Sequence, residues 1–360
     1  MENLVIDLSF WKGRRVFLTG HTGFKGSWIS LWLKQLGAEV SGYSLDYPNT
    51  SSMFYAAEIE KLLKHDIRGD IRDLNLLTKS MQSLQPEIVI HMAAQSLVRE
   101  SYVNPLNTYT TNIIGTANVF EAVRNTTSVK VVLNITSDKC YENKELLKSY
   151  CETDPMGGYD PYSSSKACSE LVSSAYRSSF FHESDVALAT ARAGNVIGGG
   201  DWSCDRIVPD AIKAFIEDKP LLVRNPQAIR PWQHVLEPLS GYLLLCQQLS
   251  NDHTNYSEAW NFGPNDENAK PVSFLVDIMA NIWGNGASWH QDDSEQPHEA
   301  SYLKLECSKA RSQLKYQPIW SLERTLNETV EWYKSWHNKK KMREFTICQI
   351  ETYQHEQSKV

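Results

Sequence analysis

Two groups of polar residues in the middle of the chain have the types and spacing needed for proton transfer. Tyr162 and Lys166 are four residues apart, so on a helix the phenol and the amine share one face. An ammonium group lowers the pKa of a neighbouring phenol, and a phenolate can take a proton from a sugar hydroxyl. Ser137, Asp138 and Lys139 follow a predicted strand and offer a hydroxyl, an acid and an amine. Alone, the tyrosine–lysine pair usually indicates only a surface pair, and the Ser–Asp–Lys stretch only a turn. Together the two groups favour catalysis.

A glycine-rich turn near the N-terminus could hold a phosphate group. Gly20, Gly23 and Gly26 stand between a predicted strand and a predicted helix, where the backbone can approach a pyrophosphate at the helix N-terminus. This spacing is also typical of a plain turn. Asp46, about 20 residues further on, is placed to bind ribose hydroxyls and to repel a 2′-phosphate, unless it is only a turn residue. The pattern therefore favours NAD over NADP.

Residues at other strand ends extend the predicted cofactor site. Ala93 and Ala94 are small enough to let a cofactor cross the strand tips, although ordinary packing explains them equally well. Asp70 suits the adenine edge, or is a solvated loop acid. The predicted cofactor contacts are Gly20, Thr22, Gly23, Phe24, Lys25, Gly26, Asp46, Asp70, Ile71, Ala93, Ala94, Gln95, Asn112, Tyr162 and Lys166.

The elements that must position these residues alternate between short β-branched runs and helical patterns, which is typical of a parallel sheet. We expect strands over 15–19, 39–45, 88–91, 130–136 and 185–191, and helices over 27–36, 111–123 and 162–180. Beyond residue 192 we expect helices over 211–217, 238–249, 271–283 and 322–337, and a strand over 260–263. The predicted fold is α/β, a doubly wound parallel sheet of Rossmann type with a smaller mixed α/β substrate-binding domain.

The domain boundaries follow from this pattern. Residues 1–195 are predicted to form the NAD-binding domain, with a returning segment at about 232–265. Residues 196–231 and 266–345 are predicted to form the substrate-binding domain. Residues 346–360, and the polar stretch at 339–341 before them, are predicted to be a frayed or weakly packed tail.

Composition excludes several classes of protein. The 360 residues are 41% hydrophobic and 22% charged, unlike a disordered chain, a coiled coil or a collagen repeat. A net charge of −7 argues against nucleic acid as a partner, and no apolar run reaches the ~18–20 residues of a membrane span. The seven cysteines are scattered and the N-terminus lacks the order of a signal peptide, so we expect a cytoplasmic protein. We also expect no bound metal, since no cysteine–histidine cluster is present.

Longer stretches of the chain resemble the extended short-chain dehydrogenase/reductases, over nearly its whole length. Within that group the chain is most similar to the nucleotide-sugar 4,6-dehydratases, and among these to the branch that acts on CDP-glucose. The resemblance is carried by the strings His21-Thr-Gly-Phe-Lys-Gly-Ser-Trp28, Thr136-Ser-Asp-Lys-Cys-Tyr141 and Pro155-Met-Gly-Gly-Tyr-Asp-Pro-Tyr162.

The resemblance implies a role for each catalytic candidate. Tyr162, assisted by Ser137, takes the proton of the C4 hydroxyl, and a tightly bound NAD accepts the C4 hydride and returns it to C6 in each turnover. Asp138 protonates the departing C6 hydroxyl, so that water is lost across C5–C6. The related dTDP-glucose dehydratases have a glutamate in place of Lys139. The C5 base is therefore either a lysine of lowered pKa or another group, with Lys139 stabilising an enolate. The product is a 4-keto-6-deoxy sugar nucleotide for bacterial surface polysaccharide.

The resemblance also implies a substrate site and an assembly. The implied substrate contacts are Arg192, Asn195, Asp201, Trp202, Arg206, Arg230 and His234. The three arginines suit a diphosphate, because their forked donors pair with phosphate oxygens, whereas Trp202 suits core packing equally well. A homodimer or higher homo-oligomer is implied, often through the helix over 162–180. Two alternatives are another NAD-dependent nucleotide-sugar dehydratase or 4-epimerase and, more remotely, a non-catalytic NAD-binding sensor or scaffold.

Overall fold

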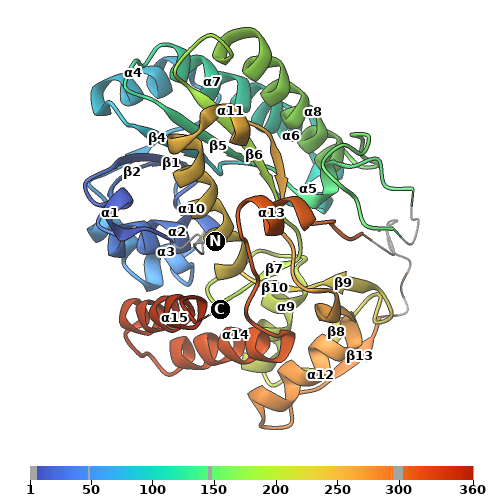
Figure 1. Cartoon of the computed structure of the whole chain (residues 1–360). Helices are drawn as coiled ribbons and strands as arrows, with labels where there is room; N and C mark the ends of the chain where they lie inside the picture. The colour runs from blue at the N-terminus through green and yellow to red at the C-terminus, as the bar shows by residue number, and fades with distance from the viewer. Residues whose placement is uncertain (1–5, 48, 145–147, 293, 295–302, 360) are drawn as a thin grey trace.

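A seven-stranded parallel sheet forms the centre of the N-terminal part (Figure 1). The structure is a computed structural model and describes residues 6–47, 49–144, 148–292, 294 and 303–359. The strand order is β11-β6-β5-β4-β1-β2-β3. The strands are β1 (Arg15–Thr19), β2 (Glu39–Ser44), β3 (His65–Arg68), β4 (Ile88–His91), β5 (Val131–Ile135), β6 (Ala187–Arg192) and β11 (Ala259–Asn261). The predicted doubly wound parallel sheet is confirmed.

Alternating side chains of the strands pack against helices on the two faces of the sheet. Phe17 of β1 and Val89 of β4 join one hydrophobic cluster with residues of α4 (Leu74–Leu84) and α7 (Gly115–Arg124), beside which α8 (Pro161–Tyr176) packs. Their neighbours Val16 and Ile90 join a second cluster with α2 (Phe24–Gln35) and α10 (Leu236–Asn251). Because successive strand residues point to opposite faces, both faces are buried, as a parallel sheet requires.

The strand order reverses between β1 and β4, whose carboxyl ends lie side by side. Ligands of open α/β sheets bind in the crevice at such a switch point. The turn after β1 contains Gly20, and the segment after β4 contains Ala93. The predicted cofactor residues therefore lie where this topology places a ligand.

The remaining elements form a smaller part with short paired strands, shown below the sheet in Figure 1. The pairs are β7 (Val196–Ile197) with β10 (Gln233–His234), β9 (Ile229–Pro231) with β12 (Ala269–Pro271), and β8 (Leu221–Val223) with β13 (Trp289–Gln291). The helices here are α9 (Ile207–Ile216), α12 (Val272–Trp283), α13 (Ser308–Gln313), α14 (Leu322–His337) and α15 (Met342–Gln357). β11 joins the main sheet and α10 packs on it, which is consistent with the proposed returning segment.

Shorter helices connect these elements. They are α1 (Leu8–Trp11), α3 (Met53–Ala56), α5 (Val98–Val103), α6 (Pro105–Tyr109) and α11 (His253–Tyr256), with 3-10 turns at Ile59–Leu62, Asp138–Cys140 and Asp266–Asn268 and π-helical turns at Thr110–Ile114 and Arg177–Phe181. Neither β3 nor α4 was predicted. β3 is a short polar edge strand without a hydrophobic run, whereas α4 has buried apolar residues at helical spacing and was overlooked. No helix in the described part of the chain is long and apolar enough to span a membrane.

The prediction of a weakly packed tail at residues 346–360 is wrong. Residues 342–357 form α15, which packs beside α14 and α2 (Figure 1). Tyr353 is fully buried, its ring meets Trp32 and Trp320 edge-on, and its hydroxyl donates to Glu237 Oε2 at 2.6 Å. The few apolar residues of this polar helix lie on its packed face, so the average composition of the segment concealed a core element.

Candidate active site

The glycine turn fits a dinucleotide pyrophosphate. A Cβ on Gly20 would lie 2.7 Å from the Ala93 nitrogen, and a Cβ on Gly26 would lie 2.1 Å from the Gly20 oxygen, so neither position tolerates a side chain. No side chain caps the N-terminus of α2, and its first turn contains no acidic residue. The free N–H groups and positive end of the helix dipole are therefore open to an anion. Phe24 and Lys25 form the first residues of this helix.

Side chains at the end of β2 suit a ribose. Asp46 is 82% exposed at the side chain, with an oxygen 3.4 Å from Arg68 Nε. Thr22 of the glycine turn is hydrogen-bonded to Ser44 Oγ at 2.8 Å, which joins the turn to the end of β2. His21 points away from the turn and pairs with Asp66 at 2.8 Å. The Asp46 carboxylate is thus the accessible acid beside the turn.

The residues predicted to lie beside the adenine are less accessible to a ligand than Asp46. Asp70 is bound by the Arg72 side chain and backbone, which hold the pKa of its carboxyl below the usual value. Ile71 is buried and packs against Gly115, where a Cβ would lie 2.5 Å from its Cδ1. Both residues follow the carboxyl end of β3, at the same edge of the sheet as the glycine turn.

Asn112 fixes the segment after β4 rather than standing free for a ligand. Its Oδ1 accepts from the Gln95 nitrogen at 2.9 Å, and its Nδ2 donates to the Gln95 oxygen at 2.9 Å and to Ser165 Oγ at 2.8 Å. Ala93 N donates to Thr19 Oγ1 at 3.2 Å. The segment over 93–95 is therefore tied to both β1 and α8.

The turn after β5 brings together two catalytic candidates. Ser137 Oγ donates to Asp138 Oδ1 at 3.0 Å, and both residues are buried. Asn195 Nδ2 donates to Asp138 Oδ2 at 3.4 Å. A Cβ on Gly194 would lie only 1.8 Å from Asp138 Oδ2, so this glycine makes the space that the carboxylate occupies. Lys139 is half-buried in the same turn and donates its backbone N–H to Ser137 Oγ at 3.2 Å.

Tyr162 and Lys166 share the buried face of α8 and point to the end of β5. Lys166 Nζ donates to the Ile135 oxygen at 3.2 Å. Burial raises the pKa of Tyr162 to about 12, and a hydrogen bond with Ser137 and the charge of Arg206 partly oppose this. Burial also lowers the pKa of Lys166 to about 8. The predicted lowering of the phenol pKa by Lys166 is not observed: burial dominates, and the groups that lower this pKa are Ser137 and Arg206.

Two further cations, Lys25 of α2 and Arg206 just before α9, lie around this centre. Burial and the neighbouring Arg206 lower the pKa of Lys25 to about 8, while Asp138 acts in the opposite direction. Arg206 is anchored by Asp201 at 2.8 Å and donates to Ser96 Oγ at 3.2 Å. The structure thus places the predicted Lys25, Asp201 and Arg206 around the same centre as Asp138 and Tyr162.

Arg192 does not fit its predicted role in substrate binding. It is buried, and its Nε and Nη2 donate to Glu170 at 2.9 and 2.8 Å. Its Nη1 donates to Tyr141 Oη at 2.7 Å and to the Glu152 oxygen at 3.2 Å. All three guanidinium nitrogens are therefore bonded inside the protein, and Arg192 locks β6 to α8.

His234 does not fit a substrate contact either. It is fully buried between Trp28 and Trp320, with ring centroids at 5.6 and 4.7 Å. Burial, assisted by Arg324, lowers its pKa to about 3, so it is a neutral core residue. Trp202 packs on Tyr333 and Trp336, which favours the core alternative. Arg230 is half-buried on β9 and donates to the Ile229 oxygen at 3.0 Å.

Two residues that position the site were not predicted. Glu170 holds Arg192 and accepts from Thr136 and Thr190, and it lies four residues beyond Lys166 on the same helix face. The spacing of Tyr162, Lys166 and Glu170 in steps of four could have indicated it. Gly194 could have been recognised only from its contact with Asp138.

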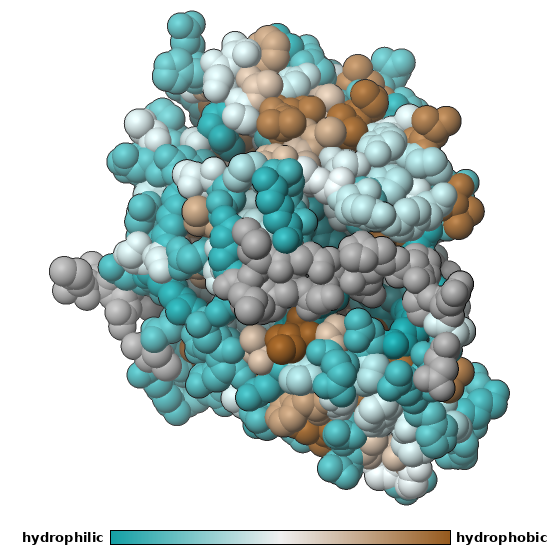
Figure 2. Space-filling model, turned by 90° about the vertical axis from the view of Figure 1, so that its right-hand side faces the viewer, coloured by the Kyte–Doolittle hydropathy of each residue, from teal (hydrophilic) through white to brown (hydrophobic). Residues whose placement is uncertain are grey.

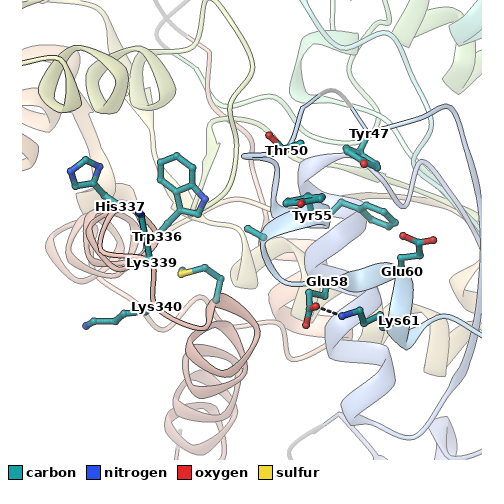
Figure 3. A pocket seen from close by; sticks show the side chains of 13 residues that line it. Tyr47, Thr50, Tyr55, Glu58, Glu60, Lys61, Trp336, His337, Lys339 and Lys340 are labelled. Carbon is teal, nitrogen blue, oxygen red and sulfur yellow. Dashed lines mark hydrogen bonds and ion pairs between the residues drawn. The ribbon is translucent and has the colours of Figure 1, made fainter.

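A cavity of about 760 Å³ lies away from this centre (Figure 3). Tyr47, Tyr55 and Lys61 line one side, and Trp336 and Lys339 line the other. It separates the α3 region from the turn between α14 and α15. None of the predicted site residues lines it, so cavity size does not indicate the active site here.

Comparison with known proteins agrees with this geometry. Residues 17–329 match the family model described as GDP-mannose 4,6 dehydratase. A CDP-glucose 4,6-dehydratase of Salmonella typhimurium is 54% identical over 337 residues, covering 92% of this chain and 94% of that protein. A dTDP-glucose 4,6-dehydratase of Haemophilus influenzae is 26% identical, covering 88% of this chain and 97% of that protein.

Solved structures show the same fold at lower identity. DesIV, a dTDP-glucose 4,6-dehydratase of Streptomyces venezuelae solved with NAD and TYD bound, has a TM-score of 0.77 and 23% identity, covering 91% of this chain and 98% of that chain. The epimerase Mth375 of Methanothermobacter thermautotrophicus has a TM-score of 0.80 and 21% identity, covering 95% of this chain and 97% of that chain. With a family model that matches most of its length and a relative that is 54% identical, the chain belongs to the GDP-mannose 4,6-dehydratase family of nucleotide-sugar enzymes.

Proposed function

We propose that the chain is a hydro-lyase that converts CDP-glucose to CDP-4-keto-6-deoxyglucose with NAD as a recycled cofactor. The observation that carries this proposal is the buried Ser137–Asp138 pair beside Tyr162 in a chain 54% identical to a CDP-glucose 4,6-dehydratase. A 4-epimerase removes no water and needs no acid at this position. The acid held by Gly194 and Asn195 therefore favours dehydration.

The glycine turn and Asp46 are the residues that would hold NAD. The turn offers the uncapped N-terminus of α2 to the pyrophosphate, and Asp46 offers an acceptor to the ribose. When bound, NAD supplies a hydride acceptor at C4 and a hydride donor at C6. Asn112 holds the segment over 93–95 at the end of β4, and Lys166 lies at the end of the neighbouring β5.

The protein groups hold and move the protons. Tyr162 takes the proton of the C4 hydroxyl, and Ser137 and Arg206 favour its ionised form. Asp138 delivers a proton to the departing C6 hydroxyl from a buried position, where bulk water does not compete. Lys139 lies one residue beyond and assists at C5. Arg206, rather than Arg192, binds the diphosphate, because Asp201 orients it toward the catalytic centre.

We further propose a cytoplasmic homodimer that assembles through α8 and the helices beside it. Val103, Leu106, Ile114 and Leu171 are exposed, and the elements that carry them pack on one another. Figure 2 shows hydrophobic side chains gathered on the upper part of the face that is turned toward the viewer. An apolar surface of this kind is typical of a subunit interface. Sedimentation of wild type and Leu106→Glu tests it, and a monomeric wild type would contradict it.

The proposed activity is tested by incubating the protein and NAD with CDP-, dTDP-, UDP- and GDP-linked hexoses, and identifying the product by mass. We expect loss of one water from CDP-glucose and no net NADH. Tyr162→Phe is expected to remain folded and to abolish turnover, which excludes a contaminating activity. Product from another nucleotide sugar but none from CDP-glucose would refute the substrate. A 4-epimer of unchanged mass would refute the reaction.

A further inference from the structure

A second cavity, of about 250 Å³, is lined by both chain neighbours of Arg206. It lies between α5, α9, β8 and the residue that follows β13. Ile207, Leu221 and Leu222 give it an apolar lining, and Arg99 and Arg224 give it a polar side. Five of its eight lining residues are charged, and its size suits a single base better than a whole nucleotide.

Arg206 connects this cavity with the catalytic residues. Its charge acts on Tyr162, and its Nη2 donates to Ser96 Oγ, one turn before Arg99. Its chain neighbours Asp205 and Ile207 line the cavity. A substrate whose sugar lies at Tyr162 and whose diphosphate lies at Arg206 therefore places its base in this cavity.

Three carboxylates line the cavity, and two of them are already engaged. Asp205 Oδ1 lies 3.5 Å from Arg99 Nη1 and 3.4 Å from Arg224 Nη1. Asp292 Oδ1 accepts from the Ser294 nitrogen at 3.0 Å and from its Oγ at 2.7 Å.

Asp210 is different from both. Among the described residues its side chain makes no hydrogen bond, and its one ion pair, with Lys213, is long at 3.9 Å. Burial raises the pKa of its carboxyl, with opposing effects of Lys213 and Arg224 and a supporting effect of Asp205. A half-buried carboxylate without a close partner is free to accept a hydrogen bond from a ligand that donates one.

We propose that Asp210 selects cytosine by accepting a hydrogen bond from its exocyclic amine. This inference rests on the proposed function, since it names the residue that recognises the base of CDP-glucose. Cytosine presents an N–H₂ donor at position 4, whereas uracil and thymine present an oxygen acceptor there. A carboxylate attracts the first group and repels the second. Ile207 and Leu221 enclose the ring without distinguishing between the bases.

The test compares CDP with UDP. Their pyrimidine rings differ only around position 4, where cytosine has an amino group and uracil has an oxygen. Their dissociation constants are measured by calorimetry on the NAD-loaded wild type and on Asp210→Asn. An amide can turn either its oxygen or its nitrogen toward the base and so tolerates both groups. We expect the UDP-to-CDP ratio of dissociation constants to fall at least about tenfold in the variant. Asp210→Ser, which has no amide, is expected to lower the ratio as well.

Two controls separate base selection from general damage. Glu217→Gln lies at the end of the same helix, is exposed and pairs with Lys219, so it should leave both affinities unchanged. Asp205→Asn removes the ion pairs of Arg99 and Arg224. It should therefore weaken the binding of CDP and the binding of UDP by similar factors. If both Asp210 variants keep the wild-type ratio, the inference is overturned, although turnover of CDP-glucose by the wild type would still support the proposed function. A wild type that binds UDP as tightly as CDP also overturns the inference, while the proposed function still depends on the turnover of CDP-glucose.

Discussion

Replacing Arg192 with methionine tests whether this arginine supports the fold or the substrate. The substitution keeps much of the aliphatic volume and removes the charge. Glu170 loses two hydrogen bonds, at 2.9 and 2.8 Å, and keeps those from Thr136 and Thr190. A buried carboxylate is then left without its cation.

The expected cost is large because both partners are buried. The side chains of Arg192 and Glu170 are 4% and 5% exposed. Removing one partner of such a pair costs about 3–5 kcal/mol of the free energy of unfolding, since the remaining charge stays desolvated. Arg124→Met is a matched control. It breaks an exposed pair with Glu121 and is expected to cost less than about 1 kcal/mol.

The stability loss caused by Arg192→Met should depend on pH in a defined direction. Burial raises the pKa of Glu170, but the charge and hydrogen bonds of Arg192 outweigh it and leave the pKa below the ordinary value. The contribution of Glu170 to wild-type stability is therefore present above its unfolded pKa of about 4.3 and is lost as the pH falls through the lowered value. The deficit of Arg192→Met should be smaller at pH 4 than at pH 7.

Guanidinium unfolding at the two pH values measures the deficit, and steady-state kinetics on the folded variant measures KM for the nucleotide sugar. We expect the stability loss with KM changed less than about threefold, whereas Arg206→Met should raise KM by at least about tenfold. A stable Arg192→Met protein with a strongly raised KM would refute the structural role of Arg192.

Three further predictions concern single residues. Asp138→Asn should let enzyme-bound NADH accumulate at 340 nm without releasing dehydrated product, and product at the wild-type rate would exclude Asp138 as the acid. Gly194→Ala should lower kcat at least about tenfold, because its Cβ would lie 1.8 Å from Asp138 Oδ2. Gly286→Ala, where the Cβ would meet nothing within 4 Å, should cost some stability through the φ of +76° but leave kcat unchanged. Burial raises the pKa of Glu237 to about 7, against hydrogen bonds from Tyr353, Trp320 and Ile319. Wild-type stability should therefore fall by on the order of 3 kcal/mol as the pH rises from about 4.5 to 7, and Glu237→Gln should abolish this decline in thermal unfolding profiles.

Much of the fold could be predicted because its signals are local. A strand of a parallel sheet is a short buried run, and a helix repeats its apolar residues at a fixed spacing, so β1, β4, β5 and β6 were located within one or two residues. β3 and α15 were missed for the opposite reason. Their sequences are polar on average, and their place depends on neighbours far away in the chain.

The chain alone was enough to name the residues that we propose to carry the chemistry: the glycines, Asp46, Ser137, Asp138, Tyr162 and Lys166 were named from type and spacing. Only the tertiary structure distinguished the arginines from one another. Arg192 and Arg206 look alike in sequence, yet one is neutralised by Glu170 inside the protein and the other is directed by Asp201 toward Tyr162. The physical reason is that a long-range ion pair depends on the packing of elements far apart in the chain, whereas helix and strand periods are properties of a few consecutive residues.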